Sequence, residues 1–259
     1  MQTQPSLFIS HGSPMMVIQE SKTALFLKKL GRSLHKPSAI IIFSAHFDLT
    51  QDIVITTGEK PETIHDFFGF PAQLYNINYP ALGSPSLAKK IAQRFRDNGL
   101  TVTLDKQRGW DHGVWVPLKL MFPEANIPIV QISINSHLGA RRNYQYGQLI
   151  ASFKQENILV IGSGNISHNL QELFNSTPTK NRSTMIKMFI DWINDKLSAK
   201  DIDSLLNYIN EAPYVLFNHP SQEHFLPFMA ALGSGDIKQA KQIHQDIENE
   251  VLAMDAYRF

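Results

Sequence analysis

The sequence predicts an α/β fold, a single domain in which helices flank a central, mostly parallel or mixed sheet. Three observations support this prediction. Apolar, β-branched segments of strand length recur along the chain, and longer amphipathic segments with helical spacing lie between several of them. No change of composition marks a domain boundary, so residues 1–259 are expected to form one domain.

The expected strands are short apolar runs at 6–10, 39–45, 52–57, 100–105, 127–134 and 158–164. The expected helices occupy 22–35, 86–98, 140–155 and 183–198. Ser86 is a plausible N-cap for the second helix, and Gly99 is a typical stop signal after it. The segment 58–85 is aromatic and broken by prolines and glycines, which is typical of a functional loop.

The composition of the chain excludes several classes of partner and of functional site. The 24 basic and 23 acidic residues leave a net charge of +1, so no overall attraction to nucleic acid or to an anionic membrane is expected. The chain has no cysteine, which excludes disulfides, thiolate metal sites and a cysteine nucleophile. The N-terminus lacks the features of a secretory signal, and no apolar run reaches the roughly 20 residues of a membrane span. We therefore expect a cytoplasmic protein.

Five of the ten histidines lie at positions suited to chemistry. His11, His46 and His168 follow strand-like runs, while His112 and His224 lie in the segments WDHGVWVPL and HPSQEHFLPF. In open α/β sheets, ligands bind at the carboxyl ends of strands. Imidazole is the commonest protein metal ligand and exchanges its proton near neutral pH. A metal site at the C-terminal ends of the strands, with its own acid and base, is therefore expected.

Each motif also has a structural interpretation. Asp111 is consistent with the N-cap of a helix that begins near His112. Ser221 is suited to cap a helix that carries Glu223 in its first turn. The glycines at 162 and 164 have neither the spacing of a dinucleotide fingerprint nor a following Lys-Ser/Thr, so nucleotide binding is rejected.

Seven short motifs occur in one order along nearly the whole chain: HGSP (11–14), SAHF (44–47), TIHDFFGFP (63–71), YPALGSP (79–85), DHGVWVPL (111–118), GSGNISHNL (162–170) and HPSQEHFLPF (219–228). Together they resemble the class III extradiol ring-cleavage dioxygenases, and most closely the DOPA 4,5-dioxygenase-like branch. The resemblance implies a metal-dependent enzyme that opens a catechol-type aromatic ring with O2.

The resemblance also implies roles for individual residues. His11, His46 and His224 are expected to bind one divalent metal ion, Fe(II) for dioxygenase activity or Zn(II) as in some relatives. His168 is expected to be the catalytic base, and His112 a second catalytic histidine that acts as an acid or stabilises oxygen. Much of the wider class uses a glutamate as the third ligand, so the neighbouring Glu223 is an alternative to His224.

His65, Trp115 and His219 are the candidate substrate-binding residues. His65 lies on the aromatic loop, and Trp115 could line the same pocket, whereas His219 could either join the site or only close its loop. Three imidazoles also suit a zinc site that activates water, so a zinc-dependent hydrolase is the alternative function. A third hypothesis is that the protein is a non-catalytic relative of these enzymes that only binds a metal. The expected partners are a small aromatic substrate and O2, and the sequence assigns no oligomeric state.

Overall fold

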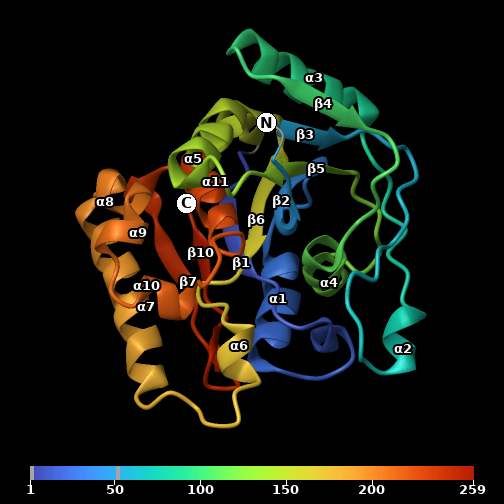
Figure 1. Ribbon diagram of the computed structural model, residues 1–259. Helices are drawn as coiled ribbons and strands as arrows, with labels where there is room; N and C mark the ends of the chain where they lie inside the picture. Colours follow the sequence, from blue (N-terminus) through green and yellow to red (C-terminus); the bar gives the residue numbers. More distant parts are fainter. Residues whose placement is uncertain (1–2, 51–52) are drawn as a thin grey trace.

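The computed structural model describes residues 3–50 and 53–259. Within these residues, one α/β domain is built around an eight-stranded mixed sheet of strand order β4-β3-β5-β2-β6-β1-β10-β7 (Figure 1). The strands of this sheet are β1 (Ser6–Ser10), β2 (Ala39–Asp48), β3 (Ile53–Thr56), β4 (Val102–Asp105), β5 (Ile129–Ile134), β6 (Ile158–Gly164), β7 (Lys241–His244) and β10 (Ala256–Arg258). Strands β8 (Ile247–Glu248) and β9 (Leu252–Ala253) form a separate antiparallel pair.

The centre of the sheet is parallel. Strand β6 pairs in parallel with β1 and with β2, and β2 pairs in parallel with β5. The antiparallel pairs lie towards the edges, between β3 and β5, β1 and β10, and β10 and β7. The carboxyl ends of β1, β2 and β6 therefore meet at one edge of the sheet, where the sequence predicts the functional site.

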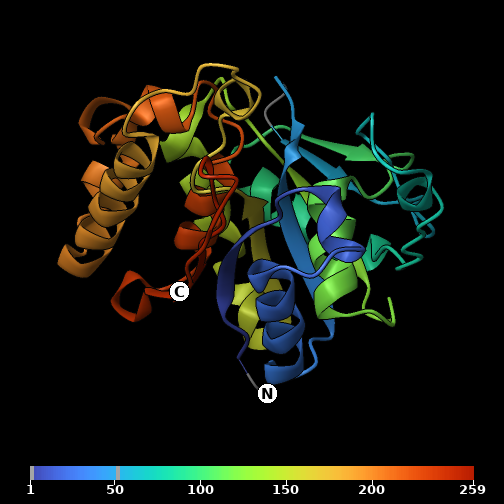
Figure 2. The ribbon, with the colours of Figure 1, turned by 90° about the horizontal axis from the view of Figure 1, so that it is seen from below.

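Helices cover both faces of the sheet (Figures 1 and 2). Alternate residues of β2 belong to separate cores: Ile40 and Ile42 pack with α1 and α4, whereas Ile41 and Phe43 pack with α3, α5, α7 and α11. Because both faces are buried, the central strands are apolar along their whole length, as the sequence shows. The longer helices are α1 (Lys22–Ser33), α3 (Pro85–Asp97), α4 (His112–Met121), α5 (Gly139–Ile150), α7 (Arg182–Ala199) and α11 (Leu226–Ser234).

Short helices connect these elements. The α-helical ones are α2 (Ala72–Tyr75), α6 (Leu170–Leu173), α8 (Ile202–Leu206), α9 (Tyr208–Glu211) and α10 (Val215–Asn218), and the 3-10 helices are η1 (Pro14–Val17), η2 (Ala151–Glu156) and η3 (Ile237–Gln239). In Figure 1, α7 to α10 group at one side of the molecule. Among the described residues, no helix combines the length and apolar character needed to cross a membrane.

The predicted elements are confirmed, with differences at their ends. Residue 52 of the predicted third strand lies outside the described residues. Helix α3 begins at Pro85, so Ser84 rather than Ser86 occupies the N-cap position, because proline at the first helical position favours a start there. The helix predicted at 140–155 changes to 3-10 geometry after Ile150. The loop 58–85 contains one helical turn, α2.

Candidate active site

Strands β1 and β2 each deliver one of the expected histidines. His11 directly follows β1, and its backbone N–H donates to the Gly164 carbonyl at 3.0 Å. The turn after it uses Gly12 at φ +53°, a backbone conformation that favours glycine. His46 lies where the pairing of β2 with β5 shifts register between Phe43 and Asp48. Such irregularities re-aim side chains, so His46 turns towards His11.

His224 comes from the segment before α11 and is held by its backbone. Its carbonyl accepts the Asn165 N–H at 2.9 Å, and a Cβ on Gly164 would lie only 2.1 Å from the same oxygen. Only glycine therefore lets the end of β6 approach this segment so closely. The capping role considered for Ser221 is wrong, because α11 begins at Leu226 and the Ser221 hydroxyl donates to Glu223 at 2.9 Å. Glu223 accordingly precedes the helix instead of occupying its first turn.

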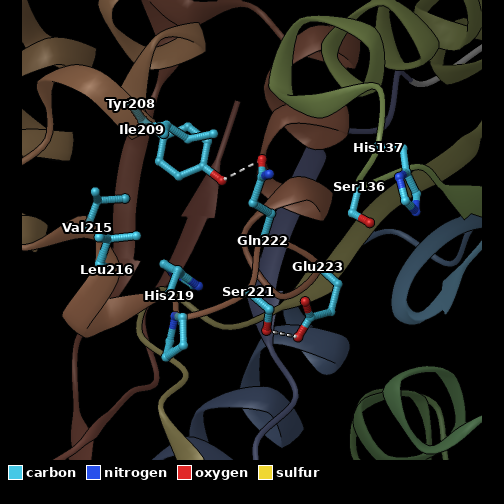
Figure 3. A pocket seen from close by; sticks show the side chains of 11 residues that line it. Ser136, His137, Tyr208, Ile209, Val215, Leu216, His219, Ser221, Gln222 and Glu223 are labelled. Carbon is cyan, nitrogen blue, oxygen red and sulfur yellow. Dashed lines mark hydrogen bonds between the residues drawn. The ribbon is translucent and has the colours of Figure 1, made fainter.

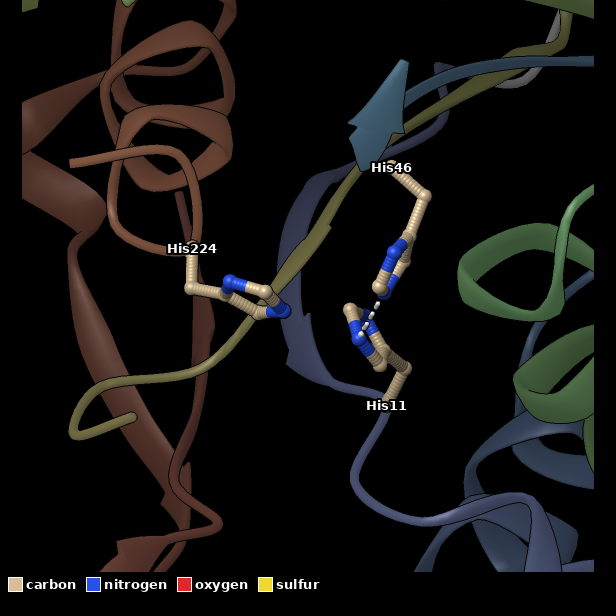
Figure 4. Close-up of side chains that lie close together, drawn as sticks. All are labelled: His11, His46 and His224. Atoms are coloured by element: carbon tan, nitrogen blue, oxygen red, sulfur yellow. Dashed lines mark hydrogen bonds between the residues drawn. The ribbon is translucent and has the colours of Figure 1, made fainter. Parts of the chain in front are cut away.

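His11, His46 and His224 converge from three separate elements (Figure 4). One side-chain nitrogen of each lies within 4.8 Å of the others, and the Nε2 atoms of His11 and His46 are 3.0 Å apart. The Nε2 atom of His224 is buried and has no hydrogen-bond partner among the described residues. Buried imidazole nitrogens are normally satisfied, so this unpaired group fits a ligand that binds in the cluster.

The opposite nitrogens of these rings face oxygen atoms. Nδ1 of His11 lies 3.0 Å from Ser163 Oγ, whose own hydroxyl donates to the Gly113 carbonyl. Nδ1 of His224 lies 3.0 Å from Glu223 Oε1, and Nδ1 of His46 lies 3.6 Å from Asp66 Oδ2. For His11 and His224, the acceptor at Nδ1 fixes the tautomer whose Nε2 is free to bind a metal, whereas the 3.6 Å between His46 and Asp66 is too long for a hydrogen bond.

Burial keeps the cluster uncharged. It lowers the pKa of His11 and His224 well below the usual value, and repulsion among the neighbouring histidines lowers both further. Burial and then repulsion from His112 lower the pKa of His46 to about 4. Metal ligation requires neutral imidazole. Three neutral imidazoles, two of them buried, without a thiolate therefore fit one Fe(II) or Zn(II) ion.

His112 is oriented by a carboxylate from the aromatic loop. Asp66 Oδ1 accepts the backbone N–H and Nδ1–H of His112, both at 2.9 Å. Burial acts to raise the pKa of Asp66, but the hydrogen bonds that it accepts from the His112 ring and backbone act in the opposite direction, and the pKa is about 2. The His112 ring centroid is 3.9 Å from that of His46, so His112 lies directly beside a metal-ligand candidate.

Asp111 occupies the N-cap position of α4, but its side chain makes no cap hydrogen bond. Its fully buried carboxylate accepts from Ser44, Gln131 and Arg108 instead. The expected capping role of Asp111 is therefore wrong, and Asp66 receives the first N–H of the helix in its place. The Asp111 carboxylate faces the interior because Arg108, Gln131 and Ser44 supply the donors that a buried charge needs.

His168 joins the cluster from the turn that follows β6. Its ring stacks on His224 with centroids 3.4 Å apart, and its backbone N–H donates to the Asn218 carbonyl at 2.8 Å. Burial lowers the pKa of His168 to about 4, although the Glu223 charge acts in the opposite direction. The structure thus brings all five expected histidines together.

The three candidate substrate-binding residues lie outside this cluster. Trp115 is fully buried and donates its indole N–H to Ile64, so it fastens the aromatic loop to α4. Nε2 of His219 bonds the Ile166 carbonyl at 2.8 Å, and Nε2 of His65 bonds that of Ile77 at 3.0 Å. His65 and His219 each line a surface cavity, and their binding of substrate stays a prediction.

Sequence reasoning missed the residues that hold the histidines. Asp66 and Ser163 were not singled out, and Glu223 was considered as a ligand or a helix-end residue but not as the partner of His224. A usable signal existed only for Asp66, which is the one acidic residue in the motif TIHDFFGFP.

Fold and site together define an α/β protein with a candidate mononuclear, histidine-rich metal centre at the carboxyl edge of its sheet. The chain belongs to the family described as the catalytic LigB subunit of aromatic ring-opening dioxygenase, whose model matches residues 5–259. The sequence resemblance to ring-opening dioxygenases and the expectation of enzymatic activity are thereby confirmed.

Similar proteins agree with this membership. The chain is 38% identical over 261 residues to a 4,5-DOPA dioxygenase extradiol from Beta vulgaris, with 98% of this chain and 96% of the relative covered. It is 38% identical over 239 residues to a protein of the same name from Escherichia coli strain K12, with 90% and 85% covered. A crystal structure of an uncharacterized Escherichia coli K12 protein matches with a TM-score of 0.80 and 31% identity over 99% of both chains.

Proposed function

We propose that the protein is an extradiol dioxygenase that opens a DOPA-like catechol with O2, and that His11, His46 and His224 hold its divalent metal ion. The observation that carries this proposal is the convergence of three neutral imidazoles, one with an unpaired buried Nε2, beside two further histidines. The family membership supplies the reaction class, and the names of the relatives supply the substrate.

A bound Fe(II) ion would supply open coordination positions for both catechol oxygens and for dioxygen. The protein side chains then divide the remaining work. His168 has a pKa of about 4 and stacks on His224, and we assign it the role of accepting a proton from a catechol hydroxyl beside the metal. We assign His112 the second role: it keeps its Nδ1–H on Asp66, and its other nitrogen stabilises oxygen, or donates a proton to it once that nitrogen has itself been protonated.

Fe(II) is proposed over Zn(II) because the family opens aromatic rings with oxygen, and this redox chemistry is not available to zinc. For the same reason the zinc-dependent hydrolase and the non-catalytic relative are not favoured. A cytoplasmic location stays a prediction from the sequence.

Oxygen consumption with a small panel of catechols tests the function. The protein is purified without chelator, its metal is analysed, and anaerobic loading with Fe(II) is compared with Zn(II). Oxygen uptake with a yellow semialdehyde product is expected with iron only. No uptake with any catechol under reducing conditions would reject the dioxygenase, and hydrolysis by the zinc form would support the alternative.

A further inference from the structure

A cavity of about 470 Å³ lies next to the candidate metal centre and is not explained by metal binding. Figure 3 shows Glu223 and Ser221 on one side of it and Val215 and Leu216 on the other. The apolar side comes from the α9–α10 segment, and the polar side comes from residues 219–223 together with Ser136 and His137. A volume of this size is within the range of small-molecule sites.

Glu223 connects the cavity to the catalytic histidines. Its Oε1 accepts from His224 Nδ1 at 3.0 Å and from the Ser221 hydroxyl at 2.9 Å. One oxygen of Glu223 and one nitrogen each of His168 and His224 lie within 4.8 Å of one another. The cavity is therefore separated from the metal-ligand nitrogen of His224 by a single imidazole ring.

The charge of the cavity selects a cation. Among the described residues that line it, Glu223 is the one carboxylate, and there is no lysine or arginine. Its second oxygen, Oε2, has no hydrogen-bond partner within residues 3–50 and 53–259. The apolar side chains opposite, Ile209, Val215 and Leu216, suit a short alkyl arm. Together these features suit an arm that ends in an ammonium group.

We propose that this cavity binds the side chain of the substrate and that Glu223 recognises its ammonium group. The inference rests on the proposed ring-opening function and adds a specificity to it. Catechols with an aminoalkyl arm are preferred, and a carboxylate on that arm is not required. Charge-assisted hydrogen bonds to a carboxylate contribute enough to favour the amine by about 10- to 100-fold in kcat/KM.

A second cavity carries charges of both signs. It is lined by Arg108 together with Glu62, Asp105 and His65. An acidic side chain would be drawn to Arg108, but this guanidinium already donates to Asp111 and to the His46 carbonyl and lies over the Phe47 ring. Of its two carboxylates, Asp105 already accepts the backbone N–H groups of Gln107 and Arg108, and Glu62 shares the cavity with the Arg108 guanidinium. The cavity beside the metal centre is therefore the better subsite for an amine.

The test compares three catechols on the iron-loaded 259-residue protein: dopamine, dihydrocaffeate, which carries a carboxylate and no amine, and methylcatechol, which carries neither. The expected kcat/KM ratio of dopamine to dihydrocaffeate is at least about 10. Glu223→Gln keeps an oxygen for His224 but removes the charge, so it should bring the ratio close to unity. Glu62→Gln makes the same chemical change in the other cavity and should preserve the ratio.

A wild-type ratio near or below unity, or a ratio that survives Glu223→Gln, would overturn the inference. A ratio near unity in Glu62→Gln would place the subsite in the other cavity and would also overturn the inference. If the protein opens methylcatechol but the kcat/KM ratio of dopamine to dihydrocaffeate is near unity, the inference fails and the proposed function stands. If no catechol is opened, the proposed function fails, and calorimetric Kd values for dopamine and dihydrocaffeate on the zinc-loaded protein still test the ammonium preference.

Discussion

Replacing Asp66 by alanine tests whether the aromatic loop positions a catalytic histidine. Asp66 Oδ1 accepts two hydrogen bonds of 2.9 Å from His112, one from the ring and one from the backbone at the start of α4. The ring contact orients Nδ1, whereas the backbone contact acts as a helix cap. The substitution removes both contacts together with a negative charge 3.6 Å from Nδ1 of His46.

Two effects of different size are expected. Loss of the cap should lower the free energy of unfolding by about 1 kcal/mol. Loss of the partner that orients His112 should lower kcat about 10- to 100-fold, the range typical for residues that hold active-site ligands in place. The KM for the catechol should change little, because Asp66 contacts His112 and not the expected substrate position.

The assay measures kcat and KM at saturating Fe(II), with metal content determined on the same samples and unfolding followed in urea. Asp66→Asn keeps an oxygen that accepts both hydrogen bonds, so its kcat should lie between those of wild type and Asp66→Ala. Thr63→Ala is the matched control, because Thr63 anchors the same loop to Asn78 and Tyr79 without touching His112. Wild-type kcat in Asp66→Ala at full metal occupancy would refute the positioning role.

Three further substitutions test the site and the core. His168→Phe should retain metal but reduce ring opening by about 10²- to 10⁴-fold, as expected for a general base; wild-type turnover in this variant would reject the assignment. Gly164→Ala places a Cβ 2.1 Å from the His224 carbonyl, so we expect about 1–3 kcal/mol of destabilisation in urea and weaker metal retention. Unchanged metal content would show that the His224 backbone can move without loss. Burial raises the pKa of Asp255 from 3.8 to about 7, so the folded state keeps a proton that the unfolded state has already released. The free energy of unfolding should therefore fall, by up to about 4 kcal/mol, as the pH rises from about 4 to 7. Asp255→Asn should flatten this dependence in urea titrations at several pH values, and an unaltered slope would exclude Asp255 as its source.

Several parts of the structure could be predicted from local sequence patterns. The buried strands read as continuous apolar runs because both of their faces are covered, and the run 158–164 coincides with β6. The short C-terminal strands could not be predicted in this way. Strands β8 and β9 have two residues each and β10 has three, so no periodicity can develop, and their pairing depends on contacts with distant segments.

By itself, the sequence determined the ligand chemistry and the edge of the sheet where the site forms. Without cysteine, a metal must bind imidazole and oxygen, and His11, His46 and His168 follow runs that form adjacent strands. Only the tertiary structure decided which groups hold those imidazoles. Asp66 meets His112 across 46 residues of sequence, and Ser163 meets His11 across 152. Periodicity and propensity describe neighbours along the chain, whereas a hydrogen-bond partner is chosen by the packing of the whole domain.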